Sequence, residues 1–547
     1  MKKTHRRIIV HVTTIFVIAL IVGLFGQIWS YFKSGATFSE LKAIDEELWK
    51  VYDPVTTWDS AGLAEGLPMD HFTREDVEQA YLRAWHSLHL AGRTGNLELL
   101  EDYFSGPCLQ HLRHLLNGDD EFFTERVNLK HNIRLNLFSL DRQVVAFTDS
   151  AMHAVVRITN GVTDQLLLHN HSEESFEVIM TLDDGHWKVR HMSHLQSTDR
   201  AMNDAPHSIS GIRRNLKGVN YYPSASPWFS FWTDFDTLAI AEDFELIKEL
   251  ELEAIRIFIP YSTFGKNQVD QVYLQRLNQL LNLAVSFDLL VVPTLFDFPE
   301  GYQINHYTQT RRHLIEVVDR FQDHSHILAW DLKNEPDLDF EVYGQSTVLE
   351  WLKLMIATIR EIDPSKPVTI GWSKPTSAHL LADKLDIISF HFYGQPSHLV
   401  TQTDALRQKV DPEKPLWLTE FGKSSLNSFF FPGGVSEAEQ AAYIQNVLFY
   451  AQKAGVNSNF VWTLHDFQRI PGGVFGWKPW IRKAQKQFGL VNAAGIRKKS
   501  AQVILDQEQI SDTRNSWTWL IKPFYFTCLL VLFLAVMLAR RISKGYF

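Results

Sequence analysis

The sequence predicts a (β/α)8 barrel that is preceded by a small α+β domain and flanked by two transmembrane helices. Three observations lead to this fold class. From residue 218 onward, short apolar runs alternate with amphipathic helical segments, which is typical of parallel sheets. Two of these runs end in a glutamate, and barrel enzymes keep their catalytic groups at the carboxyl ends of strands. An apolar segment of bilayer length lies near each end of the chain.

Length and composition set the broad class. The 547 residues are enough for two or more domains, and 45% hydrophobic with 21% charged residues indicates a globular chain. The net charge of −10 argues against a nucleic-acid partner. The two cysteines are Cys108 and Cys528. Because Cys528 falls in a predicted membrane segment, we expect no disulfide in the soluble part.

The two ends of the chain carry membrane signals. Residues 8–32 and 518–539 are almost wholly apolar, and Lys and Arg residues lie on the outer side of each segment. Basic flanks stay on the cytoplasmic side, so we expect a two-pass protein of the cell membrane with both termini cytoplasmic and the middle of the chain extracytoplasmic. A cleaved signal peptide is the alternative interpretation of the first segment.

Between the first membrane segment and the barrel, the sequence predicts a stalk over 33–71, an α+β domain over 72–197 and a linker over 198–217. Apolar residues recur at helical spacing after Thr73. The pattern then changes to that of strands, and Asp183-Asp184-Gly185 indicates a tight turn between the last two of them. The expected segments are helices within Thr73–Leu116 and strands at Ala151–Thr159, Ser175–Leu182 and His186–His194. Their order resembles the nuclear-transport-factor-2-like domains.

The barrel is predicted over 218–510. Strand candidates follow one another at intervals of mostly roughly 20–45 residues, as in a (β/α)8 barrel, with a doubly wound sheet as the structural alternative. Amphipathic helices are expected at Val348–Ile362 and Ser436–Ala454, the second with a capping box and a glycine stop. The pair Lys498-Lys499 is expected on the solvated surface. The eight strand candidates are Gly218–Tyr222, Ala254–Ile259, Leu289–Leu295, Ile327–Leu332, Pro367–Gly371, Ile387–Phe390, Leu416–Thr419 and Phe460–Trp462.

The chemistry lies at the ends of the fourth and seventh predicted strands. The fourth, ILAWDLKNEPD, delivers Glu335, and Pro336 stops the strand because proline cannot donate to the ladder. The seventh, PLWLTEFG, delivers Glu420. Glycosidic bond cleavage needs two carboxyl groups, one protonated and one ionised, on either side of a single sugar carbon. A separation of about 5–5.5 Å implies the retaining route.

The motifs Asn334-Glu335-Pro336 and Thr419-Glu420-Phe421-Gly422 resemble those of glycoside hydrolase clan A, and of its family 5-like enzymes in particular. The resemblance implies that Glu335 is the acid/base and Glu420 the nucleophile, and that the substrate is a β-linked oligosaccharide or polysaccharide. No cofactor and no metal are expected. The His169-x-His171 and His324-x-His326 pairs suggest a metal, but no third ligand is evident.

The same resemblance extends to further strand ends. Arg256 in AIRIFIP matches the arginine beside the nucleophile, His391 and Tyr393 in SFHFYG match the sixth-strand pair, and Trp462 matches the aromatic platform. Asn334 is expected to bind the sugar 2-hydroxyl. Asp297 stands where family 5 enzymes usually have a histidine, so it is expected to bind a sugar hydroxyl instead. Weaker candidates for sugar contacts are His465 and Asp466.

The function that these residues predict is a membrane-anchored retaining β-glycosidase that acts by double displacement. Two alternatives remain open. The first is a transglycosylase, in which the same covalent intermediate passes to a second sugar. The second is a non-catalytic glycan-binding subunit of a polysaccharide synthesis or export machinery, which the membrane anchors make plausible and the paired glutamates disfavour.

Overall fold

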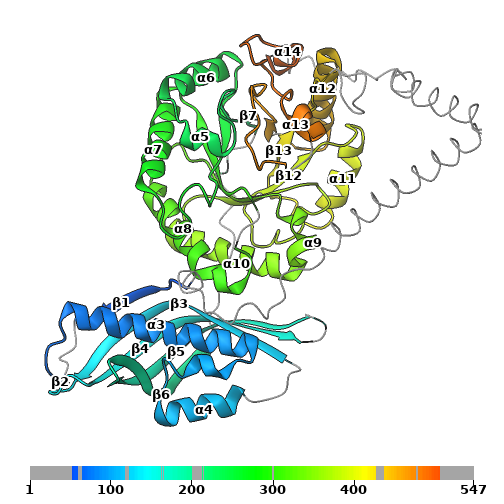
Figure 1. Cartoon of the computed structure of the whole chain (residues 1–547). Helices are drawn as coiled ribbons and strands as arrows, with labels where there is room; N and C mark the ends of the chain where they lie inside the picture. The colour runs from blue at the N-terminus through cyan, green and yellow to red at the C-terminus, as the bar shows by residue number, and fades with distance from the viewer. Residues whose placement is uncertain are drawn as a thin grey trace, which may run out of the picture. The chain divides into compact units, whose positions relative to one another are not determined.

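The computed structural model describes residues 52–59, 65–116, 122–161, 163, 165–199, 212, 215–298, 301–426, 436–456, 458–475 and 479–505. The described residues form an α+β domain followed by a barrel (Figure 1). The predicted membrane segments, 8–32 and 518–539, and most of the predicted stalk lie outside these ranges.

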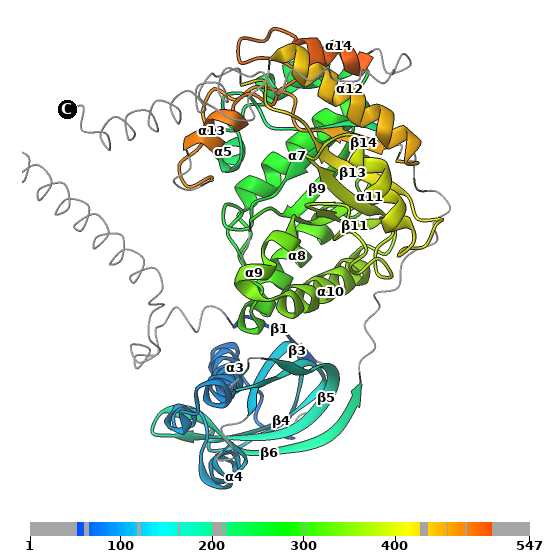
Figure 2. The same cartoon turned by 90° about the vertical axis from the view of Figure 1, so that its right-hand side faces the viewer.

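The α+β domain is built on one sheet with the strand order β1-β3-β4-β5-β6, in which β3 to β6 are antiparallel neighbours and the short β2 also pairs with β3. Helix α3 packs against β3 and β6, and the curved sheet surrounds it in Figure 2. The Asp70 side chain caps the start of this helix, and Gly95 ends it with a φ of 69°. The bounds are β1 Val55–Asp59, β2 Glu65–Gly66, α3 His71–Thr94, η2 Leu97–Leu100, α4 Gly106–Leu116, β3 Phe122–Phe138, β4 Val144–Asn160, β5 Leu166–Asp183 and β6 His186–Asp199.

Two strands of this domain differ from the sequence prediction. Strand β3 was not expected as one continuous strand, because Arg, Lys, His and Asn residues interrupt its apolar pattern. Strand β1 lies inside the predicted stalk, yet it pairs in parallel with β3 from Val55↔Lys130 to Asp59↔Arg134. The sheet therefore begins upstream of residue 72. The resemblance to nuclear-transport-factor-2-like domains stays a prediction.

The second domain is a closed barrel of eight parallel strands, in which β14 pairs with β7 and so completes the ring. This closure confirms the barrel and excludes the doubly wound sheet. Helices surround the strands in Figure 1. The strands are β7 Lys217–Asn220, β8 Ala254–Phe258, β9 Leu290–Phe296, β10 Trp330–Asn334, β11 Val368–Trp372, β12 Ile388–Phe392, β13 Leu416–Phe421 and β14 Ser458–Val461.

The helices of the barrel follow the predicted alternation. Helix α12 begins at the capping box formed by Ser436 and Glu439, and Gly455 follows its end with a φ of 70°, as predicted. The bounds are α5 Phe229–Thr233, α6 Thr237–Glu249, α7 Gln271–Ser286, η3 Ile304–His306, α8 Tyr307–Phe321, η4 Pro336–Leu338, α9 Phe340–Tyr343, α10 Gln345–Ile362, α11 His398–Arg407, α12 Glu437–Lys453, α13 Pro479–Gln485 and α14 Lys499–Leu505.

All eight predicted strands are present, with shifted ends. The largest shift is at β10, which begins at Trp330 rather than Ile327, because Ile327 makes only an isolated bridge to Val291. Lys498 corrects another expectation. It was predicted on the surface, but it is 4% exposed and its ammonium lies 2.7 Å from Asp466.

The predicted fold class included two transmembrane helices, and this part of the prediction has to be corrected. Within the described ranges, no helix combines the length and the apolar content that a bilayer crossing demands. The longest of these helices, α3, has 24 residues, but polar and charged side chains occupy one of its faces, so it buries a stripe against the sheet. The architecture that the structure supports is the α+β domain and the barrel.

Candidate active site

The two glutamates predicted from the strand ends meet at the carboxyl end of the barrel. Glu420 lies on β13 and is buried, whereas Glu335 directly follows β10 and its side chain is 24% exposed. Glu335 has a φ of 45°, a conformation that L-residues seldom adopt and that recurs at functional sites. One carboxylate oxygen of each glutamate and one ring nitrogen of His391 lie within 4.8 Å of one another. The sequence prediction that strands four and seven bring these carboxyl groups together is thus met by the geometry.

Arg256 on β8 organises the floor of the site. Its guanidinium donates to Glu420 Oε2 at 3.2 Å, to Asp331 Oδ2 at 2.8 Å, to Asn334 Oδ1 at 2.9 Å and to Asn220 Oδ1 at 3.0 Å. The fork of an arginine suits this task because its donors diverge in one plane. Arg256 is fully buried, and a buried charge is costly unless it is paired. The carboxylates of Asp331 and Glu420 supply the opposite charge.

A glycine on β11 leaves the space that this arrangement needs. A Cβ at Gly371 would lie 2.9 Å from both Arg256 Nη2 and His391 Nε2. Any larger residue there would displace one of these side chains.

His391 and Tyr393 contact different glutamates. A register shift in the pairing of β12 with β13 brings His391 opposite Glu420. The Nδ1 atom of His391 lies 2.8 Å from Glu335 Oε1 and 3.7 Å from Glu420 Oε2. The Tyr393 hydroxyl donates to Glu420 Oε1. Glu420 therefore receives donors on both oxygens, from Arg256 and from Tyr393, and donors of this kind favour the ionised form.

The electrostatic environment couples the two glutamates. Burial raises the pKa of Glu420 and the charge of Glu335 adds to the rise, whereas His391 and Arg256 oppose it. Burial also acts to raise the pKa of Glu335, but the hydrogen bond and the charge of His391 outweigh it and lower that pKa. These two directions favour the proton on Glu420 and the charge on Glu335, which is the opposite of an acid at Glu335 and an ionised nucleophile at Glu420. His391 controls this order, because Nδ1–H as a donor favours ionised Glu335, whereas Nδ1 as an acceptor favours neutral Glu335.

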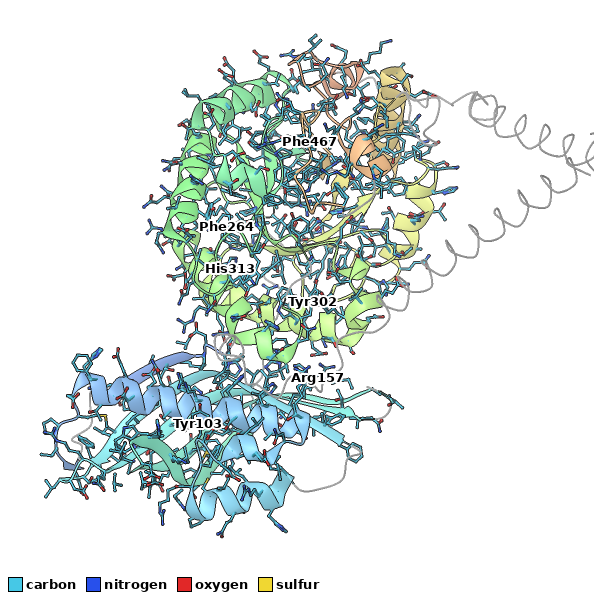
Figure 3. All side chains as sticks on the ribbon, viewed as in Figure 1. Tyr103, Arg157, Phe264, Tyr302, His313 and Phe467 are labelled. Atoms are coloured by element: carbon cyan, nitrogen blue, oxygen red, sulfur yellow. The ribbon has the colours of Figure 1, made fainter. Side chains whose placement is uncertain are left out.

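The glutamates open into a cavity of about 410 Å³ with aromatic walls. Trp462 lines it, and the Trp462 indole N–H donates to Gln485 Oε1 at 3.1 Å, which fixes the plane of the ring; its role as a sugar platform stays a prediction. Phe467 and Tyr302, labelled in Figure 3, contact residues of this lining: Phe467 packs on Trp228, and the Tyr302 hydroxyl donates to Asp339 Oδ2 at 2.6 Å. The aromatic lining residues are Tyr222, Trp228, Phe258, Phe298, Tyr393, Trp462 and Phe475.

Asp297 follows β9, lines the same cavity and is 9% exposed. Burial raises the pKa of Asp297 to about 6; the charges of Glu420 and Glu335 contribute, while Lys333 and Arg256 oppose the shift. The Lys333 ammonium does not donate to this carboxylate. It donates to the backbone carbonyls of Asp297 and Asn334, at 3.0 and 2.6 Å, and lies 3.6 Å from Asp339 Oδ2.

The shifted pKa of Asp297 predicts a stability effect of Asp297→Asn. A carboxyl whose pKa is raised from 3.8 to about 6 on folding binds more protons in the folded state, so stability falls as the pH rises from 4 to 6. The variant removes this penalty and is expected to raise the free energy of unfolding at pH 7.5 by about 1–3 kcal/mol. At pH 4 the gain should nearly vanish. Urea unfolding at both pH values measures it; an equal gain at both would contradict the burial argument.

The two histidine pairs that suggest a metal in the sequence lie at different places, one on β5 and one after α8. The rings of His169 and His171 lie 5.2 Å apart, and those of His324 and His326 lie 6.4 Å apart. Neither pair belongs to a group of three or more ligands among the described residues, where Glu335, His391 and Glu420 form such a group. The guanidinium beside Glu420 would repel a cation at that place, so this donor set fits acid–base chemistry better than metal binding.

The remaining sequence candidates fall outside the site. His465 Nε2 lies 2.6 Å from Asp243 Oδ1, and Asp466 accepts from Lys498 at 2.7 Å, so both are held in structural pairs. Several residues of the hydrogen-bond network and the cavity lining were not predicted from the sequence. These residues are Asn220, Tyr222, Trp228, Asp331, Lys333, Asp339 and Gln485. Asp331 and Lys333 stand in the same run as Glu335, so charged residues inside an apolar strand were a signal for them.

Barrel glycosidases combine two features that are seen here: a closed parallel barrel, and two close carboxyl groups at the carboxyl ends of its strands. Residues 210–468, a range that spans the eight barrel strands, match the family Cellulase (glycosyl hydrolase family 5). Human β-glucuronidase is 25% identical over 272 residues, which are 46% of this chain and 39% of that protein. Rat β-glucuronidase is 22% identical over 248 residues, 43% of this chain and 36% of that protein. The chain thus spans about two fifths of the length of the curated relatives it matches.

Solved structures with a similar course of the chain include GH5_18 from Streptomyces cattleya in complex with GlcNAc. Its TM-score is 0.46 at 16% identity, covering 56% of this chain and 82% of that one. An exo-β-1,4-mannosidase from Opitutaceae bacterium strain TAV5 has a TM-score of 0.46 at 19% identity, covering 56% and 61%.

Proposed function

We propose that the chain is a retaining glycosidase that cleaves β-linked glycans by double displacement. The observation that carries this proposal is that one carboxylate oxygen of Glu335 and one of Glu420 lie within 4.8 Å of each other. Inverting enzymes hold their carboxyl groups about 6.5–9.5 Å apart to admit a water, whereas retaining enzymes hold them about 5–5.5 Å apart. The spacing leaves room for a sugar carbon between the two groups and none for an additional water.

In the first step, Glu420 attacks the anomeric carbon and the glycosidic C–O bond breaks. The proton of Glu335 passes to the leaving oxygen, and a covalent glycosyl–Glu420 ester forms. In the second step, ionised Glu335 takes a proton from a water molecule, whose oxygen attacks the anomeric carbon and releases Glu420. Two inversions at the same carbon leave its configuration unchanged.

The other site residues have supporting roles in this proposal. Arg256 and Tyr393 hold the Glu420 carboxylate in place for attack through donors on its two oxygens. His391 decides whether Glu335 is protonated or ionised, through the 2.8 Å contact between its Nδ1 atom and Glu335 Oε1. Asn334 binds the 2-hydroxyl, and Trp462 packs its flat face against the sugar ring.

Product stereochemistry tests the mechanism. A panel of β-glucan and β-mannan oligosaccharides is incubated with the protein, and the anomeric proton of the first product is followed by NMR before mutarotation. We expect the β-anomer to appear first. Appearance of the α-anomer first would refute double displacement. Products longer than the substrate would show transfer to a second sugar through the same intermediate.

The coupling of the two carboxylates predicts the effect of Glu335→Gln on the nucleophile. Since the charge of Glu335 raises the pKa of Glu420, its removal is expected to lower that pKa. The readout is the rate of covalent labelling by an activated 2-fluoro glycosyl fluoride, whose fluoride leaves without help from an acid. The acid limb of the labelling rate should move to lower pH in the variant, and a limb that stays or moves upward would contradict the assigned coupling.

A further inference from the structure

Two adjacent tyrosines at the end of β7 are both fully buried, yet their hydroxyls have different environments. The Tyr221 hydroxyl donates to Asp243 Oδ2 at 2.9 Å. Tyr222 lines the cavity, and its buried hydroxyl makes no hydrogen bond of ordinary geometry. Successive residues of an extended chain face opposite sides, so one tyrosine closes a structural pair and the other faces the glutamates.

Asp297 repeats this observation from the neighbouring wall. Asp297 belongs to the cavity lining, and its buried Oδ2 atom makes no hydrogen bond of ordinary geometry. Burial raises the pKa of Tyr222, and the charge of Asp297 and a weaker hydrogen-bonding interaction with its carboxylate add to the rise, so the two groups face each other. An unpaired buried polar atom is costly and therefore rare. Here a donor and an acceptor face each other beside the catalytic carboxylates, and neither has a hydrogen bond of ordinary geometry.

We propose that Tyr222 and Asp297 form a recognition pair for one hydroxyl of the sugar that is bound at the glutamates, and that this pair selects neutral sugars over uronic acids. The hydroxyl accepts a hydrogen bond from Tyr222 and donates one to Asp297, which satisfies both unpaired atoms at once. The inference rests on the proposed function, because it assumes that a sugar occupies this cavity.

The charges around the cavity support selection against uronic acids. Four carboxylates line it, those of Asp297, Glu335, Asp339 and Glu420. Among the described lining residues, Lys333 is the one cation. Its ammonium is already committed to two backbone carbonyls and to Asp339.

A uronate carboxylate would thus enter a pocket of like charge without a cation to pair with. A neutral hydroxyl group in the same place is not repelled by these carboxylates. The charge pattern therefore separates this site from the activity named in its curated relatives, which are β-glucuronidases.

The hydroxyl pairing is tested by a double-mutant cycle between protein and substrate. The best neutral aryl β-glycoside is compared with its monodeoxy analogues for the wild type, Tyr222→Phe and Asp297→Asn. Each variant should lose roughly 10–100-fold in kcat/KM on the parent sugar. On one monodeoxy analogue, the same variants should lose less than about threefold, because the partner hydroxyl is already absent. Equal losses on the parent and on every analogue would overturn the pairing.

The adjacent structural pair supplies the controls. Tyr221→Phe and Asp243→Asn make the same chemical changes in a pair that lies outside the cavity lining. Thermal unfolding of all four variants separates lost folding from lost recognition. The controls should change the parent-to-deoxy ratio by less than about threefold. Controls that change it as much as Tyr222→Phe would show a general packing effect and overturn the assignment.

Selection against uronic acids is tested with the same neutral glycoside and its C6 uronic acid counterpart. We expect the wild type to prefer the neutral sugar at least about 100-fold in kcat/KM, and Asp297→Asn to narrow this gap at least about fivefold. Comparable turnover of the two sugars by the wild type would overturn the inference while leaving the proposed glycosidase intact. Absence of turnover and of Glu420 labelling with every glycoside would instead refute the proposed function itself.

Discussion

Glu420→Ala is expected to lower kcat for glycoside hydrolysis at least about 10⁴-fold, which corresponds to about 5.5 kcal/mol of transition-state stabilisation. The carboxylate is the atom group that bonds to the anomeric carbon, and Arg256 and Tyr393 serve it rather than replace it. Alanine leaves the pocket without any nucleophile at that position. Steady-state kinetics on the best aryl glycoside measure the loss.

The control for this variant is Glu242→Ala, an identical change at an exposed position of α6. It should leave kcat within about twofold of the wild type, since substitutions at such positions change little. Thermal unfolding shows whether the buried change harms the fold. A folded Glu420→Ala protein that keeps more than a tenth of the wild-type kcat would refute the assigned nucleophile.

Glu335→Ala has the second-largest expected effect, and its size depends on the leaving group. For an oligosaccharide, whose leaving oxygen needs a proton, kcat/KM should fall roughly 10²–10⁴-fold. For a 2,4-dinitrophenyl glycoside, whose leaving group departs without a proton, formation of the intermediate should stay within about tenfold of the wild type. The second step is still slowed, because no base activates the water.

Azide distinguishes this role from a general structural effect. Because azide needs no base, it should attack the glycosyl–Glu420 intermediate of Glu335→Ala, raise turnover of the dinitrophenyl glycoside and give a β-glycosyl azide. The wild type should be indifferent to azide. Loss of activity that is the same for both leaving groups and insensitive to azide would contradict an acid/base role for Glu335.

The barrel was predictable because its signals are local. Each strand is a short apolar run, and Pro336 and the capping box at Ser436 mark element ends directly in the sequence. Strand β3 of the α+β domain was missed for the opposite reason, since its polar residues hide the period of two. Strand β1 has the appearance of a linker until β3 lies beside it, which is a long-range contact that no local pattern reports.

The candidate site divides in the same way. The residues that the sequence predicted lie on or directly after barrel strands, and the closed barrel brings them into one network. They are Glu335, Glu420, Arg256, His391 and Tyr393. The sequence predicts Tyr222 only as the last residue of the strand Gly218–Tyr222, because nothing in the sequence distinguishes it from Tyr221. Lys498 was expected in solvent, and only the fold shows its buried partner Asp466.

The most direct test of the central claim is intact-protein mass spectrometry after incubation with activated 2-deoxy-2-fluoro glycosyl fluorides, followed by peptide mapping. Double displacement predicts a mass increase of one fluoroglycosyl group, located on the peptide that contains Glu420, and no increase in Glu420→Ala. A label on Glu335 or elsewhere, or turnover of glycans by a protein that no member of the panel labels, would contradict the proposed mechanism.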